Sequence, residues 1–350
     1  MARTVATNFS GALQYPYATS ATDVFKKEDI QTLALAVDQH DHTAGKGLSV
    51  APTAGSVTNA MLGPDVARAN LLTNGGFEIW QRGGGPFNGG GLYGPDRWVN
   101  YVPGGTTSTS KDVSNTDVAA GVGSCAAITT TAPANFGNGI YQVIDANADM
   151  LTMRGRQVTV SVRVKCSQAN SVRVGLEGDK AVAGPSVFSS YHPGGGVYAT
   201  LTATITLGVV NGLTVWITGT AAGTWYVDNA CLVVGSQAAN YVPLHPADDL
   251  ARCLRYYEVL VEGTGVQSFF LSGYGTAAVG VRSNWVFRVP KPVTPTVTKV
   301  GTWTTANCGQ PTIAGSDKNS TLLSTSCTGT GDTYAYPSAA GMNVTAEANP

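Results

Sequence analysis

The sequence predicts a mostly β protein, with an N-terminal arm and helix, a β-sandwich, a short connecting helix and a C-terminal β domain. Charged residues make up 12% of the 350-residue chain, against about a quarter in an average soluble domain, while 43 residues are glycine. Short runs that alternate apolar and polar residues recur between Gly, Asn and Pro turns, which is typical of half-buried strands. Helical spacing of apolar residues is convincing in only two segments.

The composition excludes several classes of protein. Lys and Arg total 21 against 22 for Asp and Glu, a formal net charge of -1, so the basic excess that phosphate binding requires is missing and we expect no nucleic-acid partner. No window approaches 18 uninterrupted apolar residues, so we expect no membrane insertion. The first ten residues contain no apolar core typical of a secretory signal, and we expect assembly in a cytoplasm.

The N-terminal third divides into an arm, a helix and a linker. Residues 1–22 read as an extended polar arm without periodicity. A helix then begins at Thr22 or Asp23, both good N-caps, and keeps its apolar spacing to about His40. We assign residues 1–45 to the arm and helix, and the Gly- and Thr-rich residues 46–69 to a linker.

The central part, residues 70–245, shows regularly spaced strands without intervening helices, and this spacing indicates a sandwich. The expected strands are 157–165, 171–176, 200–207, 213–217 and 225–233.

Residues 246–350 are expected to form a helix followed by the C-terminal β domain. The helix is predicted over 246–258, with two carboxylates in its first turn that suit the helix dipole. The expected strands are 268–271, 277–281, 285–289 and 296–300, with further weaker ones to the end of the chain.

The six cysteines lie far apart in the sequence and include no C-x-x-C pair, so no closed zinc site is expected. Assembly in a reducing cytoplasm favours free, buried thiols. Cys308 and Cys327 are a possible exception, because both lie in one β-rich segment and are candidates for cross-strand neighbours.

Several segments resemble, in order and spacing, a jelly-roll domain of bacteriophage tail-fibre and other virion proteins. They are 70–83 (NLLTNGGFEIWQRG), 94–98 (GPDRW), 139–142 (GIYQ), 155–161 (GRQVTVS) and 225–229 (WYVDN). Residues 251–258 (ARCLRYYE) resemble the short helix that follows this jelly roll, and 287–292 (FRVPKP) resemble a strand of the C-terminal β domain after it.

The resemblance implies a structural virion protein with a carbohydrate-module-like jelly-roll sandwich, usually a homotrimer. Residues 1–45 would then serve virion attachment or trimerisation, with other virion proteins as partners, and the C-terminal β domain would be the outward tip that contacts a host-surface glycan. Two alternatives stay open. One is a head decoration, neck, collar or baseplate protein that binds only other virion proteins, and the other is a secreted carbohydrate-binding module.

His40-Asp41-His42 is the sharpest candidate for a metal site. Residues i and i+2 of an extended segment face one side, so both imidazoles can approach one ion. Two nitrogens are too few, but three chains on a trimer axis would supply six, enough for a transition metal, and the resemblance to trimeric phage fibres implies such sites. The alternative, which we favour, is a polar helix C-terminus. Calcium is a weaker possibility, with Asp96, Glu177, Asp179 and Asp228 as candidate oxygen donors and no clustered motif to support them.

The aromatic residues suggest where a glycan or a protein partner would bind. We interpret most of them, including Trp80, Trp98, Trp216 and Trp225, as core residues. The candidates for an exposed contact lie in Gly-rich loops: Phe87, Asn88, Tyr93, Tyr191 and His192. We expect no enzymatic activity, because the chain has neither a Gly-x-Ser-x-Gly elbow nor a His-Glu-x-x-His helix.

Overall fold

The structure is a computed structural model that describes residues 4–8, 13–17, 68–116, 123–144, 153–178, 185–208, 212–262 and 271–350. The chain divides into two compact units, Met1–Thr58 and Asn59–Pro350. The predicted helix that ends near His40, the His40 and His42 pair, and almost all of the predicted linker lie outside the described residues.

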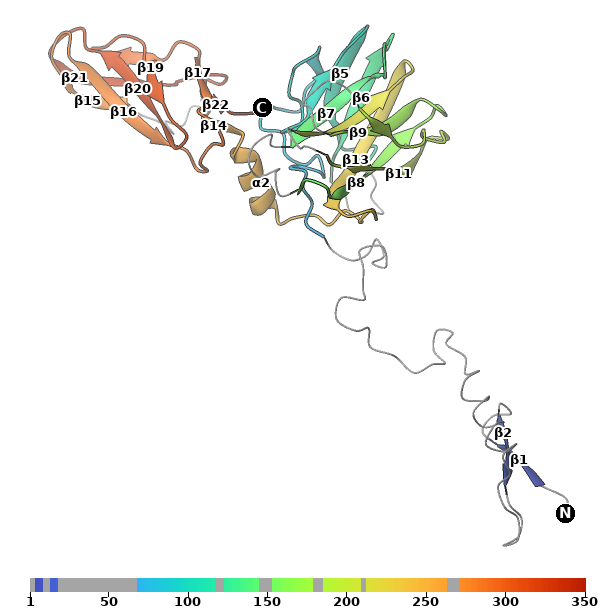
Figure 1. The fold of residues 1–350 in the computed structure, drawn as a ribbon. Coiled ribbons are helices and arrows are strands. Elements are labelled where there is room, and N and C mark those ends of the chain that lie inside the picture. Colours follow the sequence, from blue (N-terminus) through green and yellow to red (C-terminus); the bar gives the residue numbers. More distant parts are fainter. Residues whose placement is uncertain are drawn as a thin grey trace. The chain divides into compact units, whose positions relative to one another are not determined.

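In the first unit, the described residues form a two-stranded antiparallel sheet (Figure 1). β1 (Thr4–Asn8) pairs with β2 (Leu13–Tyr17), and Thr4 lies opposite Tyr17. The sequence predicted an extended arm here but not this pairing, because pairing depends on the turn between two strands as much as on either strand.

In the second unit, two antiparallel sheets form the β-sandwich (Figure 1). The six-stranded sheet has the order β11 (Val197–Thr206), β8 (Gln157–Cys166), β13 (Gly223–Val234), β6 (Cys125–Thr131), β5 (Thr106–Asp112), β3 (Phe87–Asn88). The five-stranded sheet has the order β10 (Val187–Phe188), β9 (Val172–Gly178), β12 (Leu213–Gly219), β7 (Asn138–Ile144), β4 (Val99–Tyr101). The predicted mostly β fold with a sandwich is confirmed.

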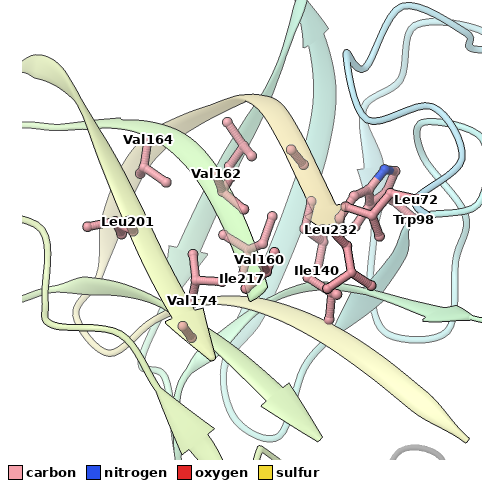
Figure 2. Close-up of a cluster of buried hydrophobic side chains, with 14 of the residues drawn as sticks. Leu72, Trp98, Ile140, Val160, Val162, Val164, Val174, Leu201, Ile217 and Leu232 are labelled. Atoms are coloured by element: carbon pink, nitrogen blue, oxygen red, sulfur yellow. The ribbon is translucent and has the colours of Figure 1, made fainter. Parts of the chain in front are cut away.

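The core of the sandwich lies between the two sheets. Alternate side chains of β8, from Val158 to Val164, point inward and are fully buried, as the alternation in the sequence predicts. They pack in one cluster with inward side chains of β9 and β12, such as Val174 and Ile217 (Figure 2). Trp98 and Leu72 belong to the same cluster, so two residues of the resemblance segments are core residues.

The connecting helix α2 spans Pro246–Leu254, with His245 as its N-cap. The side chain of His245 accepts a hydrogen bond from Ala247 N at 3.2 Å. The sequence predicted a helix to residue 258, and that end is wrong. The chain leaves the helix before Tyr257, because β14 (Tyr257–Glu262) pairs with β22 (Asn343–Glu347) at the far end of the sequence.

In the C-terminal β domain, the described residues form three three-stranded antiparallel sheets. Their orders are β14-β22-β17 (Thr296–Val300), β15 (Leu271–Gly275)-β21 (Gly331–Tyr336)-β18 (Thr304–Ala306), and β16 (Gly280–Val286)-β20 (Ser320–Ser326)-β19 (Thr312–Ser316). The strand predicted at 296–300 is confirmed as β17. The two strands predicted at 277–281 and 285–289 are wrong as separate elements, because the single strand β16 overlaps one end of each and pairs continuously with β20.

All six cysteines are buried and free. Cys308 and Cys327 lie opposite each other in an antiparallel bridge, which confirms that they are cross-strand neighbours. The helix in the described part of the chain is too short and too polar to cross a membrane.

Candidate functional site

The outer face of the five-stranded sheet carries a cluster of aromatic side chains. In β12, Leu213, Val215 and Ile217 point into the sandwich core. Because side chains alternate along a strand, Trp216 points to the opposite, outer face. Its neighbours in register are Tyr141 of β7 and Gly175 of β9. Trp216 is therefore buried without being part of the core between the sheets.

Rings from β4, β7 and the segment before β7 cover Trp216. Tyr141 lies 4.7 Å from the Trp216 ring, and Tyr101 and Phe136 present edges at 5.0 and 5.2 Å. Tyr101 and Phe136 stack on each other at 5.0 Å with an interplanar angle of 6°. These geometries are the offset-stacked and edge-to-face arrangements that aromatic pairs favour. The covering rings are half-buried, so each presents part of its surface outward.

Two charged side chains lie among these rings. Glu177 of β9 is buried, and its Oε2 accepts a hydrogen bond of 3.1 Å from Trp216 Nε1. Arg173 lies four residues before Glu177 on the same face of β9, and its guanidinium lies 3.5 Å from the Phe188 ring and 4.9 Å from the Tyr191 ring. Together, Tyr101, Phe136, Tyr141, Phe188 and Tyr191, built around Trp216, form what we call the aromatic face.

The chemistry of the aromatic face suits a ligand with both apolar surface and hydroxyl groups. Flat half-exposed rings offer contact area at little cost in side-chain entropy, and a few polar groups at the rim fix orientation. The C–H faces of a sugar ring meet that description, as does a protein partner rich in apolar side chains.

The structure brings only one of the predicted contact residues to the aromatic face. Tyr191 is exposed and lies against Arg173. Phe87 and Asn88 are on the other sheet, where β3 pairs with β5, and Phe87 stacks on Trp80 at 6.3 Å. Asn88 is exposed.

His192 was expected to be exposed, and that expectation is wrong. It is fully buried, its Nε2 lies 2.9 Å from Val164 O, and its Nδ1 accepts a hydrogen bond of 2.9 Å from Gly194 N. Nε2 thus holds the loop against β8, and Nδ1 closes the turn at Gly194 within the loop. The residue positions the Tyr191 loop and does not reach a partner at the surface.

Tyr93 is half-buried and contacts the C-terminal residue of the chain. Its hydroxyl donates to Pro350 O at 3.2 Å, and the guanidinium of Arg82 lies 4.9 Å from its ring. Burial raises the pKa of Tyr93 to about 12. Tyr93 therefore lies where the end of the chain meets the sandwich, not in an open loop.

The same region contains a dense joint between the sandwich and the C-terminal β domain. The Arg82 guanidinium stacks on Tyr257 at 3.5 Å, forms an ion pair with Glu347, and lies 3.8 Å from Asp96. Arg97 stacks on Tyr256 at 3.7 Å. We call these residues, Arg82, Asp96, Arg97, Tyr256, Tyr257 and Glu347, the joint.

The joint brings together residues from several of the resemblance segments. Arg82, Asp96 and Arg97 come from the first two segments, and Tyr256 and Tyr257 come from the helix segment. Burial raises the pKa of Asp96 to about 6, against two hydrogen bonds from Gln81 and the nearby Arg82 charge that lower it. The side chains of these segments therefore hold the two β regions together.

No group of three or more His, Cys, Asp or Glu side chains among the described residues is close enough to hold a metal ion. Of the candidate calcium ligands, Asp96 accepts from Gln81, Glu177 accepts from Trp216, and Asp228 accepts from the N–H of Asn229. Asp179, His40 and His42 lie outside the described residues.

Trp216 was interpreted as a core residue, and it is fully buried. It lies on the outer face of its sheet and not between the two sheets. The alternation in the sequence predicts this outer position, because Leu213, Val215 and Ile217 share one face of the strand and Trp216 lies on the other. The positions of Phe136 and Tyr101 could not be predicted in this way, because these residues are distant from Trp216 in the sequence and contact it only in the folded chain.

No known family model matches the sequence, and no curated protein matches it. Among solved structures, the CBM22-1 xylan-binding domain from Paenibacillus barcinonensis Xyn10C is similar at 13% identity and a TM-score of 0.34, over 49% of this chain and 98% of that chain. A family 11 carbohydrate-binding module from Clostridium thermocellum, in complex with a mixed-linked tetrasaccharide, is similar at 14% identity and a TM-score of 0.28, over 43% and 96% of the two chains. At these TM-scores the function has to be argued from the residues themselves.

Proposed function

We propose that this chain is a non-enzymatic structural protein of a bacteriophage virion, a trimeric tail fibre or fibre-like appendage whose sandwich binds a host-surface glycan. The observation that carries the glycan part is the aromatic face, where half-exposed rings surround Trp216 and its partner Glu177. The virion part is supported by the resemblance segments, whose side chains meet in the joint.

Weak binding at each copy is sufficient for such a function. A trimer that carries three aromatic faces, repeated over several appendages, makes every binding event after the first effectively intramolecular. Avidity then exceeds the affinity of one face by orders of magnitude without any further contact. The low charge of the surface limits non-specific attraction to other charged surfaces.

The competing proposal is a head decoration, neck, collar or baseplate protein that binds only other virion proteins. The aromatic face also favours this role, because Tyr, Phe and Arg are enriched at the centres of protein interfaces. The two proposals differ in whether the isolated protein binds any glycan.

A glycan array probed with the full chain separates the two proposals. We expect selective binding that is lost in Tyr141→Ala and retained in Tyr226→Ala, which removes a half-buried tyrosine of β13 in the other sheet. Absence of binding to every glycan, with intact fold, would favour the role within the virion. Antibody against the chain, imaged on particles, locates the protein: decoration of the tail supports the fibre, and decoration of the head contradicts it.

The proposed trimer has a direct test in light scattering. The fibre predicts a species of three times 36.0 kDa. A 36.0 kDa monomer at every concentration would contradict the trimer and, with it, the transition-metal site that His40 and His42 would form on a three-fold axis.

A further inference from the structure

Cys308 and Cys327 occupy a position in the C-terminal β domain that suits a covalent bond between them. They form an isolated antiparallel bridge. Two backbone hydrogen bonds of 3.0 Å flank the pair, from Gly309 N to Ser326 O and from Thr328 N to Asn307 O. Since these bonds join the residues on either side, the cysteines themselves are a non-hydrogen-bonded pair. In such pairs the Cα atoms approach to about 4.5 Å and the side chains lie on one face.

The contacts of the two thiols agree with this geometry. Cys308 Sγ donates to Tyr334 O at 3.2 Å, and Cys327 Sγ lies 3.6 Å from Thr333 Oγ1. The two sulfur atoms therefore contact adjacent residues of β21. Cys327 Sγ packs against Gly275 of β15, where a Cβ would lie 2.1 Å from the sulfur. A disulfide spans Cα separations of about 4.4 to 6.8 Å, which includes that of a non-hydrogen-bonded pair.

We propose that Cys308 and Cys327 form an intrachain disulfide when the protein meets an oxidising environment. The oxidant is a small-molecule disulfide such as oxidised glutathione. The thiolate of one cysteine attacks it, forming a mixed disulfide and releasing one small thiol. The second cysteine, after losing its proton, attacks the mixed disulfide and releases the other small thiol. Two protein thiols are thus oxidised to one disulfide, and one small disulfide is reduced to two thiols.

The disulfide would cross-link a small β domain whose sheets, among the described residues, have three strands each. It closes a loop that contains β19 and β20, and loop closure restricts the unfolded chain. We expect the oxidised C-terminal β domain to melt about 10 °C above the reduced one. This inference does not depend on the proposed function.

Refolding of the full chain in a glutathione redox buffer tests the pairing without requiring an oxidant to enter the folded core. Trypsin cleaves after Lys299 and Lys318, so Cys308 and Cys327 fall on separate peptides, 300–318 and 319–350, with no other cysteine in either. We expect these two peptides to be linked before reduction and separate after it, with the other four thiols free. Cys308→Ser, the matched control, should yield no linked peptide and five free thiols.

Three results would overturn the proposal. They are six free thiols in an oxidising buffer, glutathione adducts at Cys308 or Cys327 without a linked peptide, and linked peptides that involve other cysteines instead. A melting temperature that is the same in oxidised and reduced wild type, as expected for Cys308→Ser, would contradict the stapling role.

Discussion

Lys291 Nζ lies 2.7 Å from Glu258 Oε2, and the side chains of both residues are fully buried. The same ammonium donates to Leu254 O, the last carbonyl of α2. Glu258 belongs to the helix segment of the resemblance and Lys291 to the strand segment. The ion pair thus joins two segments that lie more than thirty positions apart in the sequence.

Lys291→Met should destabilise the C-terminal β domain by about 3 kcal/mol, because the buried Glu258 carboxylate then keeps only the exposed Arg288 guanidinium, 3.8 Å away, as a counter-charge. Chemical denaturation of the full chain measures the loss. Adding Glu258→Gln in the same chain should recover part of it, since a neutral amide is less costly to bury. A double variant that is as unstable as the single one would mean that the lost packing of the lysine stem, not the charge, dominates.

Trp216→Phe should cost more stability than Trp225→Phe. Both indoles are buried, and both substitutions remove similar volume. Trp216 Nε1 donates to the buried Glu177, whereas Trp225 Nε1 has no hydrogen-bond partner in the described part of the chain. Loss of a donor to a buried carboxylate adds about 1 to 3 kcal/mol. Equal free energies of unfolding for the two variants would show that the Glu177 bond contributes nothing.

Asp96 should make the stability of the protein depend on pH between about 4 and about 6. Burial raises the pKa of this carboxyl from 3.8 to about 6, so the folded chain binds the proton more tightly than the unfolded chain. Its contribution is fully present below about pH 4 and is lost as the pH rises through about 6, by up to about 3 kcal/mol.

Asp96→Asn removes this titration. The free energy of unfolding of the wild type minus that of the variant, measured from pH 4 to pH 7, should fall with rising pH. Taking the difference cancels other carboxylates, such as Asp249, whose pKa burial also raises. A difference that stays constant over this range would contradict the role assigned to Asp96.

Gly275→Ala should destabilise the C-terminal β domain by about 1 to 3 kcal/mol, through overpacking. The new Cβ would lie 2.1 Å from Cys327 Sγ and 3.2 Å from Cys327 Cβ, so β15 or the residue that follows β20 must shift. Gly315→Ala in β19 is the matched control, because nothing lies within 4 Å of its added Cβ. Thermal melting of both variants measures the difference, and similar melting temperatures would show that the sheets accommodate the extra methyl group freely.

The strands of the sandwich were predictable because their signal is local. Residues 157–165 alternate without interruption, and β8 spans Gln157–Cys166. The end of α2 was not predictable in the same way, because Tyr257 and Glu258 leave helical geometry to pair with β22, which lies almost ninety positions later. Pairing between distant segments leaves no trace in a local window.

The site shows the same contrast. The burial of Trp216 agrees with the sequence interpretation, and the alternation along its strand indicates which face of the sheet it lies on. The burial of His192 could not be predicted from its own segment, because its partner Val164 lies in a distant strand. The stacking of Arg82 on Tyr257 could not be predicted either, because the two residues lie 175 positions apart in the sequence. Contacts between segments that are distant in the sequence were visible only in the structure.

The affinity of the full chain for its preferred glycan, compared between wild type, Tyr141→Ala and Tyr226→Ala by calorimetric titration, tests the central claim most directly. Tyr141 covers Trp216 on the aromatic face, and Tyr226 is a half-buried tyrosine of β13 in the other sheet. We predict that Tyr141→Ala weakens binding roughly 10-fold, the effect of about 1.4 kcal/mol of lost stacking, and that Tyr226→Ala leaves it unchanged. Unchanged affinity in Tyr141→Ala, or an equal loss in both variants, would contradict the assignment of the aromatic face as the binding site.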